Sequence, residues 1–502
     1  MDTVLVNPGG REKIYQSLGS ELTAVEPPLW CRLIGGYLIN RGFEIDICDT
    51  EALEIGPDAL AEKVEVLNPR IVTIVVFGHQ PSASTQQMVG AREAALAIKK
   101  RNKDRKIIIV GGHVSALPER TLREEPIDFA CNGEGPETIA GLLNLSESKW
   151  AINQDLETVP GLVWWDTDYK KSKVLKNSPA PVQKDLDTEF HGNVWHMLPM
   201  EKYRAHNWQC FEDLSHRQPY ASIYTTLGCP YKCVFCCINA PFGRNSYRMR
   251  TPSAVISEVD HLYTQYGVKT FKIIDEMFVL NERHVRQICE GLSKKPYVSE
   301  LNFWAYARVD TVREDMISML RSAGIRWLAL GIESGSDHVR DGAEKSFSED
   351  EIFNIVEKIQ QGGISVIGNF IFGLPDDTLQ SMRSTLDLAK KLNCEFANFY
   401  SAMAYPGSRL YQNALENNWD LPSEWSGFSQ HSFDCTPLPT DHLSSAEVLK
   451  FRDQAFHEYF ENKSYLDMVT QKFGTETRKH IEAMSKTRLP RLIVDDEASI
   501  KN

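Results

Sequence analysis

Short apolar runs of strand length alternate with helical patterns along two long stretches of the chain, and this alternation limits the possible folds more than any other feature. In residues 1–150 five such runs are expected to be strands, and the third, Ile71 to Phe77, is almost entirely apolar. A strand of that kind is typical of a parallel sheet that helices cover on both faces. The spacing predicts a doubly wound, flavodoxin-like α/β domain over residues 1–150, whose ligand site lies at the carboxyl ends of the strands.

The second stretch of alternation runs from residue 216 to 411. Six apolar runs, each followed by a helical pattern, predict a full or partial β/α barrel with its catalytic loops at the C-terminal ends of the strands. We expect residues 151–215 to form a connecting segment with some β structure, and residues 412–502 to form a helical region. The expected barrel strands are Ile223–Thr226, Phe271–Asp275, Phe303–Ala307, Trp327–Gly331, Val366–Phe372 and Phe396–Ala402.

Net charge and hydropathy disfavour two classes of partner. The chain has 502 residues and a formal net charge of −13. This charge argues against nucleic acid as a principal partner, because the phosphate backbone binds basic surfaces. No charged segment followed by an apolar stretch opens the chain, and no apolar run approaches the roughly 18 residues that a membrane span needs. We therefore expect a cytoplasmic protein without a membrane span.

Three of the 11 cysteines stand at a short fixed spacing, Cys229-x3-Cys233-x2-Cys236, directly after the first expected barrel strand. Iron–sulfur clusters are bound by thiolates, normally four per cluster. A loop with three thiolates leaves one iron of a [4Fe–4S] cluster without a protein ligand, and an open coordination position distinguishes a reactive metal site from a structural one. Structural zinc is the alternative. It requires a second Cys or His pair, and we find none at suitable spacing.

With the aromatic Phe235 before its last cysteine, this loop resembles the cysteine motif of the radical S-adenosylmethionine (SAM) superfamily. The resemblance implies that Cys229, Cys233 and Cys236 bind a [4Fe–4S] cluster whose open iron is chelated by the amino and carboxylate groups of SAM. It also implies that one electron from the cluster cleaves SAM to methionine and a 5′-deoxyadenosyl radical, which abstracts a hydrogen atom from the substrate.

The resemblance continues through the barrel in the family's order. It implies contacts with SAM at the ends of successive strands: Asp275 and Glu276 for the amino group, Arg308 for the carboxylate, Glu333 and Ser334 for the ribose and carboxylate, and Asn369 in the segment beside adenine. SAM combines a cation, a carboxylate, an ammonium and two hydroxyls, so acids together with an arginine suit it. Each of these residues taken alone is more often a helix cap or an ion pair, and their joint order supports the hypothesis.

The N-terminal domain resembles the cobalamin-binding domain of B12-dependent radical SAM enzymes. The residues that carry this resemblance follow the expected strands: Asn7, Ser82, Ser84, Gly111, Gly112, His113 and Glu134. Glycines at strand ends let a bulky corrin or nucleotide tail approach the backbone. The chain has no Asp-x-His sequence of the kind that places a histidine on cobalt in mutase-type domains. His79 and His113 lie near strand ends and are the candidates for an axial ligand.

Together the two resemblances imply a cobalamin-dependent radical SAM enzyme with a [4Fe–4S] cluster, SAM and cobalamin as cofactors. Methylation of an unactivated carbon of a small-molecule substrate is the favoured reaction, and cyclisation or rearrangement is the alternative within the same subfamily. A low-potential electron donor such as flavodoxin or ferredoxin is the expected partner. The sequence indicates neither the substrate nor a catalytic residue beyond the cofactor contacts.

The sequence is less consistent with two other functions. A tRNA methylthiotransferase would need a second set of three cysteines, for which Cys31, Cys48 and Cys131 are the candidates. Cys31 falls in a helical pattern and Cys48 inside an expected strand, and the net charge disfavours RNA. A non-catalytic sensor of cobalamin or of an iron–sulfur cluster would not need the set of SAM contacts.

Overall fold

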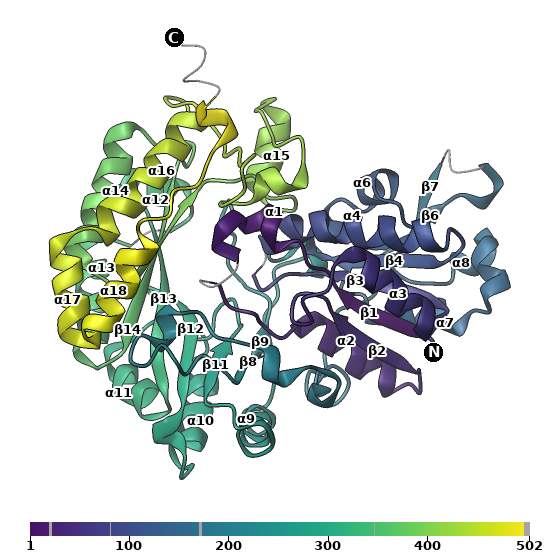
Figure 1. The fold of residues 1–502 in the computed structure, drawn as a ribbon, viewed down its shortest axis with the longest axis horizontal. Helices are drawn as coiled ribbons and strands as arrows, with labels where there is room; N and C mark the ends of the chain where they lie inside the picture. Colours follow the sequence, from purple (N-terminus) through teal and green to yellow (C-terminus); the bar gives the residue numbers. More distant parts are fainter. Residues whose placement is uncertain (20–22, 81, 170–172, 346, 496–502) are drawn as a thin grey trace.

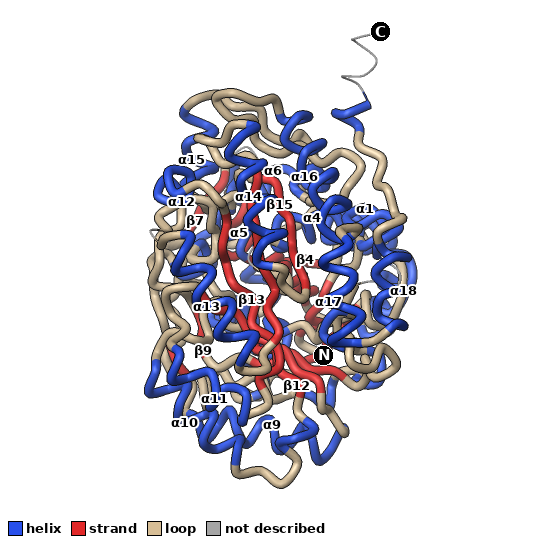
Figure 2. The backbone as a smooth tube through the Cα atoms, turned by 90° about the vertical axis from the view of Figure 1, so that its left-hand side faces the viewer, coloured by secondary structure: helices blue, strands red, loops and turns tan. Residues whose placement is uncertain are grey.

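The computed structural model describes residues 1–19, 23–80, 82–169, 173–345 and 347–495. Two α/β units stand side by side, and the helices of the C-terminal region pack along the outer side of the second unit (Figure 1). The strands form the interior and the helices the periphery (Figure 2). Within the described part of the chain, no helix combines the length and apolar character that crossing a membrane requires.

The first unit is a sheet with helices on both faces. Its first five strands are parallel in the order β2-β1-β3-β4-β5, which is the flavodoxin-like order that the sequence predicts. The alternation of side chains along the strands separates two cores: α2 and α7 pack on one face, and α3 and α4 on the other. The bounds are β1 Thr3–Asn7, α2 Leu29–Ile39, β2 Ile45–Asp49, α3 Pro57–Leu67, β3 Ile71–Val76, α4 Ala83–Arg101, β4 Lys106–Gly111, β5 Phe129–Cys131 and α7 Pro136–Asn144.

The segment after residue 150 adds two antiparallel strands to this sheet. β6 (Leu162–Trp165) pairs with β5, and β7 (Val174–Lys176) pairs with β6, so the sheet has seven strands. β5 has only three residues, and β6 covers the hydrogen-bonding edge that β5 would otherwise expose. Part of the expected connecting segment therefore completes the first sheet. The short helices of this unit are α1 Arg11–Tyr15, α5 Gly112–Ala116, α6 Pro118–Glu124 and α8 Asn153–Leu156.

The second unit is an open β/α barrel of six parallel strands in the order β15-β14-β13-β12-β11-β8. This confirms the predicted partial barrel. Its strands are β8 Tyr220–Ile223, β11 Thr270–Ile273, β12 Asn302–Arg308, β13 Ile325–Glu333, β14 Ser365–Phe372 and β15 Phe396–Ser401. Its helices are α9 Pro252–Tyr266, α10 Glu282–Ser293, α11 Glu314–Ser322, α12 Asp337–Gly342, α13 Glu349–Gln361, α14 Leu379–Leu392 and α15 Arg409–Glu416.

The first barrel strand lies three residues earlier than the expected Ile223–Thr226. The chain continues into β9 (Thr226–Leu227), which leaves the barrel and pairs antiparallel with β10 (Arg248–Met249). These two short strands form the base of the loop that contains the three cysteines. β8 ends at Ile223 because the backbone N–H and the hydroxyl of Thr225 donate hydrogen bonds to the Asp275 carboxylate instead of continuing the sheet.

The C-terminal region joins both units. The helices α16 (Ser445–Phe460), α17 (Lys463–Phe473) and α18 (Thr475–Met484) pack beside the barrel, whereas the segment before them reaches the first unit. Trp425 and Phe428 belong to the core beneath α4. The Trp425 ring lies 4.4 Å from the His113 ring, and its Nε1 donates to Glu125 at 3.2 Å. The two units are thus linked by packing as well as by the chain.

Glu26 ties the first unit to the barrel. Its carboxylate is 4 % exposed and accepts from Lys272 Nζ at 3.0 and 3.1 Å and from Ser222 Oγ at 3.0 Å. His79 and His206 also face it, at 3.9 and 3.5 Å. Burial raises the pKa of Glu26, but Lys272 and the two histidines lower it by more, so the net pKa lies well below its ordinary value.

A depressed carboxyl pKa makes stability depend on pH. The contribution of Glu26 is present above the pKa of an unfolded glutamate, about 4.3, and is lost as the pH falls below that value. We expect the urea midpoint to fall more steeply in the wild type than in Glu26→Gln when the pH is lowered from about 5.5 to about 3.5. Parallel curves for the two proteins would show that Glu26 gains nothing from its partners.

Candidate functional site

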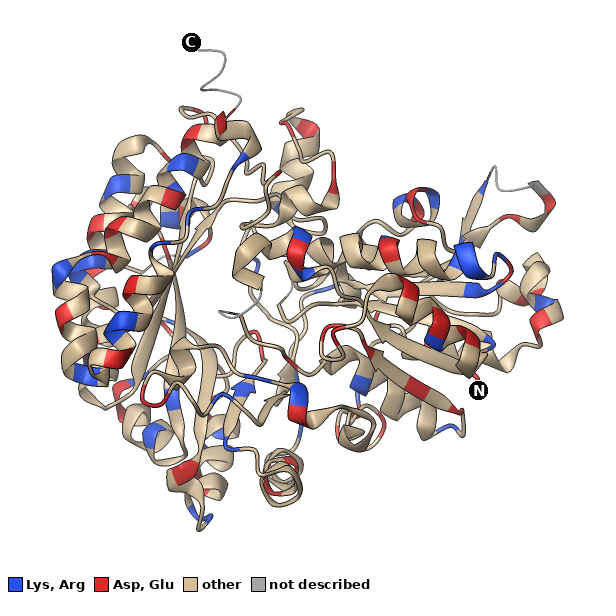
Figure 3. Cartoon of the chain, viewed as in Figure 1, with Lys and Arg blue, Asp and Glu red and all other residues tan. Residues whose placement is uncertain are grey.

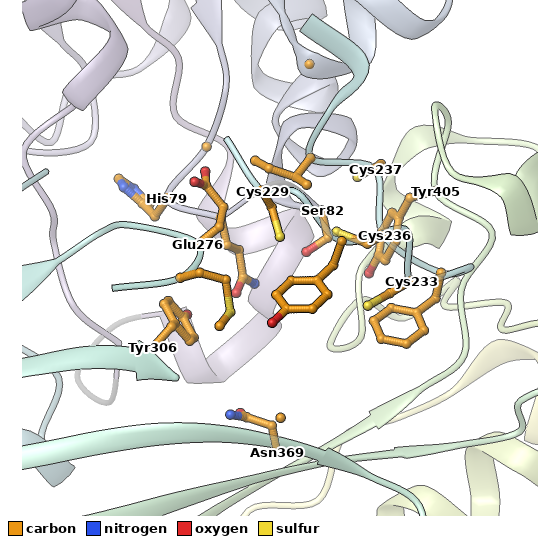
Figure 4. Close-up of a pocket in the computed structure, with 18 of the residues that line it drawn as sticks. His79, Ser82, Cys229, Cys233, Cys236, Cys237, Glu276, Tyr306, Asn369 and Tyr405 are labelled. Carbon is orange, nitrogen blue, oxygen red and sulfur yellow. The ribbon is translucent and has the colours of Figure 1, made fainter. Parts of the chain in front are cut away.

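A cavity of about 340 Å³ lies between the two units. From the first unit it is lined by the segments after β3 and β4, and from the barrel by the cysteine loop and the C-terminal ends of β11 to β15 (Figure 4). The carboxyl ends of both parallel sheets therefore meet in one space. This is the position in which each fold places its ligands.

The cysteine loop is fixed by backbone contacts at both ends. Gly228 has φ +87°, and a Cβ there would lie 2.5 Å from the Ser246 carbonyl oxygen, so a side chain at this position is excluded. The Gly228 N–H donates to Glu276 Oε2 at 3.2 Å, and Asn239 Nδ2 donates to the Cys229 carbonyl at 3.1 Å. These contacts restrain the loop near both of its ends.

Cys229, Cys233 and Cys236 all line the cavity and remain partly accessible. Burial raises the pKa of each thiol, that of Cys229 to about 11, so a bound cation is needed to hold them as thiolates. In the described ranges no three His, Cys, Asp or Glu side chains converge on a point where a single ion would bind. The three thiols border a shared space instead, and an iron–sulfur cube offers its ligand positions at separate corners. The residues present fit such a cluster.

Cys237, the fourth thiol in this part of the chain, is 8 % exposed and also lines the cavity. The three cysteines considered for a second cluster do not share a site. Cys31 and Cys131 are buried in the core on one face of the first sheet, and Cys48 is buried in the core on the other face.

Phe235 of the cysteine motif lines the cavity, and so do four of the predicted SAM contacts: Glu276, Arg308, Glu333 and Asn369. Burial raises the pKa of Glu276 to about 7. Asn369 donates to the Leu330 carbonyl at 3.1 Å and accepts from Asn398 Nδ2 at 3.0 Å, so its amide is oriented by the neighbouring strands.

Asp275 and Ser334, the two other predicted contacts, are buried behind the lining. Asp275 is 1 % exposed and is hydrogen-bonded to Thr225 and Thr226. Ser334 is fully buried, and its hydroxyl lies 3.1 Å from that of Thr385. Both hold the strand ends from which Glu276 and Glu333 project.

Arg308 has a partner already. Its guanidinium forms a bidentate ion pair with Asp310, with N–O distances of 2.9 and 3.0 Å. It also lies 4.0 Å from the centre of the Tyr231 ring. Its Nη1 is 3.8 Å from Cys233 Sγ. The positive charge is thus placed beside the cysteine loop in a fixed orientation.

A second buried cation, Lys345, was not predicted from the sequence. It lines the cavity, is 5 % exposed, forms an ion pair with Glu333 and donates to the Gly331 carbonyl at 3.2 Å. A Cβ on Gly331 would lie 2.5 Å from Lys345 Nζ, so this glycine makes room for the ammonium group. Glu333 has φ +69°, a strained conformation that turns its side chain at a bulge in β13.

Of the residues predicted in the first unit, Ser82 and Gly112 line the cavity. The other five predicted residues lie outside the lining: Asn7, Ser84, Gly111, His113 and Glu134. Their contacts are with neighbouring strands and with the barrel. Ser84 donates to the Val76 carbonyl and accepts from the His113 N–H. A Cβ on Gly111 would lie 2.1 Å from the Val76 oxygen, so the glycine allows β3 and β4 to approach. Asn7 donates to Asp49 at 2.8 Å, and Glu134 is ion-paired with Arg248 of the barrel at 2.6 Å.

The two candidate axial histidines differ in placement. His113 is buried outside the lining, and burial lowers its pKa to about 3. His79 lines the cavity, with Glu26 and Glu51 each 3.9 Å from one of its ring nitrogens (Figure 4). Burial lowers the pKa of His79, but the two carboxylates raise it by more. Both carboxylates therefore stabilise the protonated ring relative to the neutral one, and only the neutral ring has a free lone pair for a metal.

Apolar and phenolic side chains complete the cavity. Trp30 and Phe77 stack with their ring centres 3.7 Å apart and form a flat wall at the first unit. Tyr306 and Tyr400 face the cavity from the barrel. Tyr306 stands two residues before Arg308 on β12, so strand alternation could have placed it on the same inner face. Nothing comparable in the sequence indicates Lys345, which lies outside the strands.

Comparison with known proteins agrees with this geometry. The family model for the radical SAM superfamily matches residues 223–389, and the model for the B12 binding domain matches residues 15–143. An uncharacterized methyltransferase of Pyrococcus horikoshii is 28 % identical over 463 residues, which are 92 % of each chain. An anaerobic magnesium-protoporphyrin IX monomethyl ester cyclase of Rubrivivax gelatinosus is 25 % identical over 480 residues, 95 % of this chain and 81 % of that one.

Solved structures share the fold. The radical SAM methyltransferase TsrM of Kitasatospora setae, with cobalamin and a [4Fe–4S] cluster bound, superposes with a TM-score of 0.66 at 17 % identity over 92 % of this chain and 90 % of that chain. The cobalamin-dependent radical SAM enzyme OxsB gives a TM-score of 0.66 at 15 % identity, covering 96 % of this chain and 71 % of that chain. The chain thus contains a B12-binding domain followed by a radical SAM domain, with one shared cavity between them.

Proposed function

We propose that the protein methylates an unactivated carbon of a small-molecule substrate held in the cavity between its two units. The observation that carries this proposal is that the cysteine loop and the strand ends of the B12-binding domain line the same cavity. A methyl donor on one wall and a hydrogen-abstracting radical on the other can then reach one substrate carbon. When bound, the cluster with SAM supplies the radical, and cobalamin supplies the methyl group.

The chain's own residues bind and orient these groups. In this proposal Cys229, Cys233 and Cys236 bind the cluster, and Glu276, Glu333 and Arg308 surround the amino-acid end of SAM. Asn369 and Phe235 contact the rest of SAM, while Asp275 and Ser334 position the carboxylates. At the first unit, Ser82 and Gly112 lie next to cobalamin, and Asn7, Ser84, Gly111, His113 and Glu134 position that wall.

The role of Lys345 in binding the amino-acid end of SAM can be tested by mutation. Glu333 and Lys345 form a buried pair of opposite charges, and the ammonium and carboxylate of SAM could exchange partners with them without leaving a charge unpaired. We expect Lys345→Met to raise the Kd for SAM about 10- to 100-fold, as the loss of a buried charge-assisted hydrogen bond would. Lys345→Arg should lose much less. Binding of 5′-methylthioadenosine, which has no amino-acid end, should be unchanged. Equal weakening for both ligands would show that Lys345 acts on the fold.

The function itself is tested by the products. The protein, reconstituted without oxygen with cluster and cobalamin, is given SAM, a low-potential reductant and candidate substrates of the protein's own host. We expect both 5′-deoxyadenosine and S-adenosylhomocysteine, with the methyl group recovered on carbon. Formation of 5′-deoxyadenosine without S-adenosylhomocysteine would instead indicate cyclisation or rearrangement. Absence of both products from the loaded protein would indicate a sensor.

The reaction needs one electron for each SAM that yields the radical. We infer that a small carrier such as flavodoxin or ferredoxin supplies it, and that the protein works in the cytoplasm, where such carriers are present.

A further inference from the structure

Five residues of the cysteine loop are exposed to solvent. Pro230, Lys232, Gly243, Arg244 and Asn245 are exposed, and we call these five residues the loop face. Asn245 Nδ2 donates hydrogen bonds to the carbonyl oxygens of Pro230 and Tyr231, at 3.2 and 2.7 Å. The turn at 243–245 therefore packs against the segment that follows Cys229. The loop face therefore lies on the solvent side of the segment whose cysteines face the cavity.

The loop face is positively charged in an acidic protein. The net charge of the chain is −13, yet residues 228–257 contain no Asp or Glu. Two of the four cations in this range, Arg248 and Arg250, are ion-paired with Glu134 and Glu258. Among the residues that the structure places, no acid lies within ion-pair distance of Lys232 or Arg244. Both charges are available to a partner.

Asp310, an acid that lies near Tyr231 of the loop, does not cancel these charges. Asp310 forms a bidentate ion pair with the Arg308 guanidinium. The same guanidinium lies over the ring of Tyr231, next to the loop face. Elsewhere on the surface Lys and Arg are interspersed with Asp and Glu along the helices (Figure 3). Lys232 and Arg244 thus mark a local positive site on a surface whose overall charge repels acidic proteins.

We propose that the loop face is the docking surface for a small acidic one-electron carrier of low potential. The proposal rests on the proposed function, which requires an electron at the cluster. In the proposed function the cofactors occupy the cavity side of the loop, so a carrier approaches from the solvent side. In the step itself the carrier is oxidised by one electron and the cluster is reduced by one, with no proton transferred.

Charge steering makes the proposal measurable. Complementary charges raise association rates by 10- to 1000-fold at low salt, and salt screens the effect. The probe is a reduced acidic flavodoxin mixed with cluster-loaded protein, and the readout is the rate at which cluster absorbance bleaches. We expect Lys232→Glu with Arg244→Glu to slow this reduction about tenfold or more at low salt. In about 0.5 M salt the difference should nearly vanish. Arg244→Glu alone, which lies outside the cysteine spacing, should give a smaller loss in the same direction.

Two controls separate docking from damage. Lys100 lies in the last turn of α4 and Lys103 two residues after the helix ends, and both are exposed. Lys100→Glu with Lys103→Glu makes the same change in net charge there and should leave the flavodoxin rate within about twofold of wild type. Dithionite, which needs no docking surface, should reduce all variants at one rate, and iron and sulfide contents should match. A flavodoxin rate that is insensitive to the loop-face charges overturns the proposal. It leaves the proposed function intact if dithionite still supports SAM cleavage.

Discussion

Replacing Cys233 with alanine is expected to abolish cluster binding and, with it, the cleavage of SAM. Two thiolates cannot hold a [4Fe–4S] cube that already has one open corner. The loss in 5′-deoxyadenosine formation should exceed about 10³-fold, since the uncatalysed reaction is negligible. Cys229→Ala and Cys236→Ala should behave alike, because all three thiols line the same space. Iron and sulfide analysis of protein prepared without oxygen measures the effect directly.

Cys237→Ala is the matched control. Cys237 adjoins Cys236 and lines the same cavity but stands outside the Cys-x3-Cys-x2-Cys spacing. We expect it to keep its iron and sulfide and to lose at most about 1 kcal/mol of stability through the missing sulfur. If Cys237→Ala lost the cluster while Cys236→Ala retained it, the assignment of the ligands would be wrong.

Glu258→Ala is expected to destabilise the protein by about 3–5 kcal/mol. Glu258, on α9, is 3 % exposed and forms ion pairs with Arg250 and with Arg32 of the first unit, which are 4 % and 0 % exposed. It also accepts from Trp195 Nε1 at 2.9 Å. Without the carboxylate, two buried guanidinium groups face each other with no counter-charge. Urea unfolding of the wild type and the variant at neutral pH measures the loss.

An exposed glutamate supplies the comparison. Glu300 pairs with Lys269 at 2.6 Å on the barrel surface, where both side chains are largely solvated. Glu300→Ala should therefore shift the urea midpoint far less than Glu258→Ala does. A similarly small effect for Glu258→Ala would mean that Arg32 and Arg250 find other partners. The ion pairs of Glu258 would then not stabilise the contact between the two units.

The period of the apolar runs was enough to predict both folds, because strands buried on two faces need continuous apolar sequence. The same signal cannot show where a strand leaves its sheet. The run Ile223–Thr226 consists of β-branched and aromatic residues, yet the Asp275 carboxylate accepts a hydrogen bond from the Thr225 N–H and β8 ends at Ile223. Likewise β6 and β7 join the first sheet by pairing with β5, and this pairing depends on long-range contacts rather than on local sequence.

Motif order predicted the cysteine loop and the side chains that project from strand ends, because these positions are fixed by the barrel itself. It could not separate residues that line the cavity from residues that hold them. Asp275 and Ser334 follow the same pattern as Glu276 and Glu333 but are directed into the protein. Lys345 was missed for the opposite reason, since it comes from the segment after α12 and reaches the cavity only through the room left at Gly331.

The most direct test of the account is the electron paramagnetic resonance spectrum of the reduced protein, recorded with and without SAM. If three cysteines leave one iron open to SAM, adding SAM should change the signal of the reduced cluster. The change should be absent when SAM is replaced by 5′-methylthioadenosine, which cannot chelate iron through an amino-acid end. A reduced cluster whose spectrum is the same with and without SAM, or protein that binds zinc in place of iron and sulfide, would contradict the central claim.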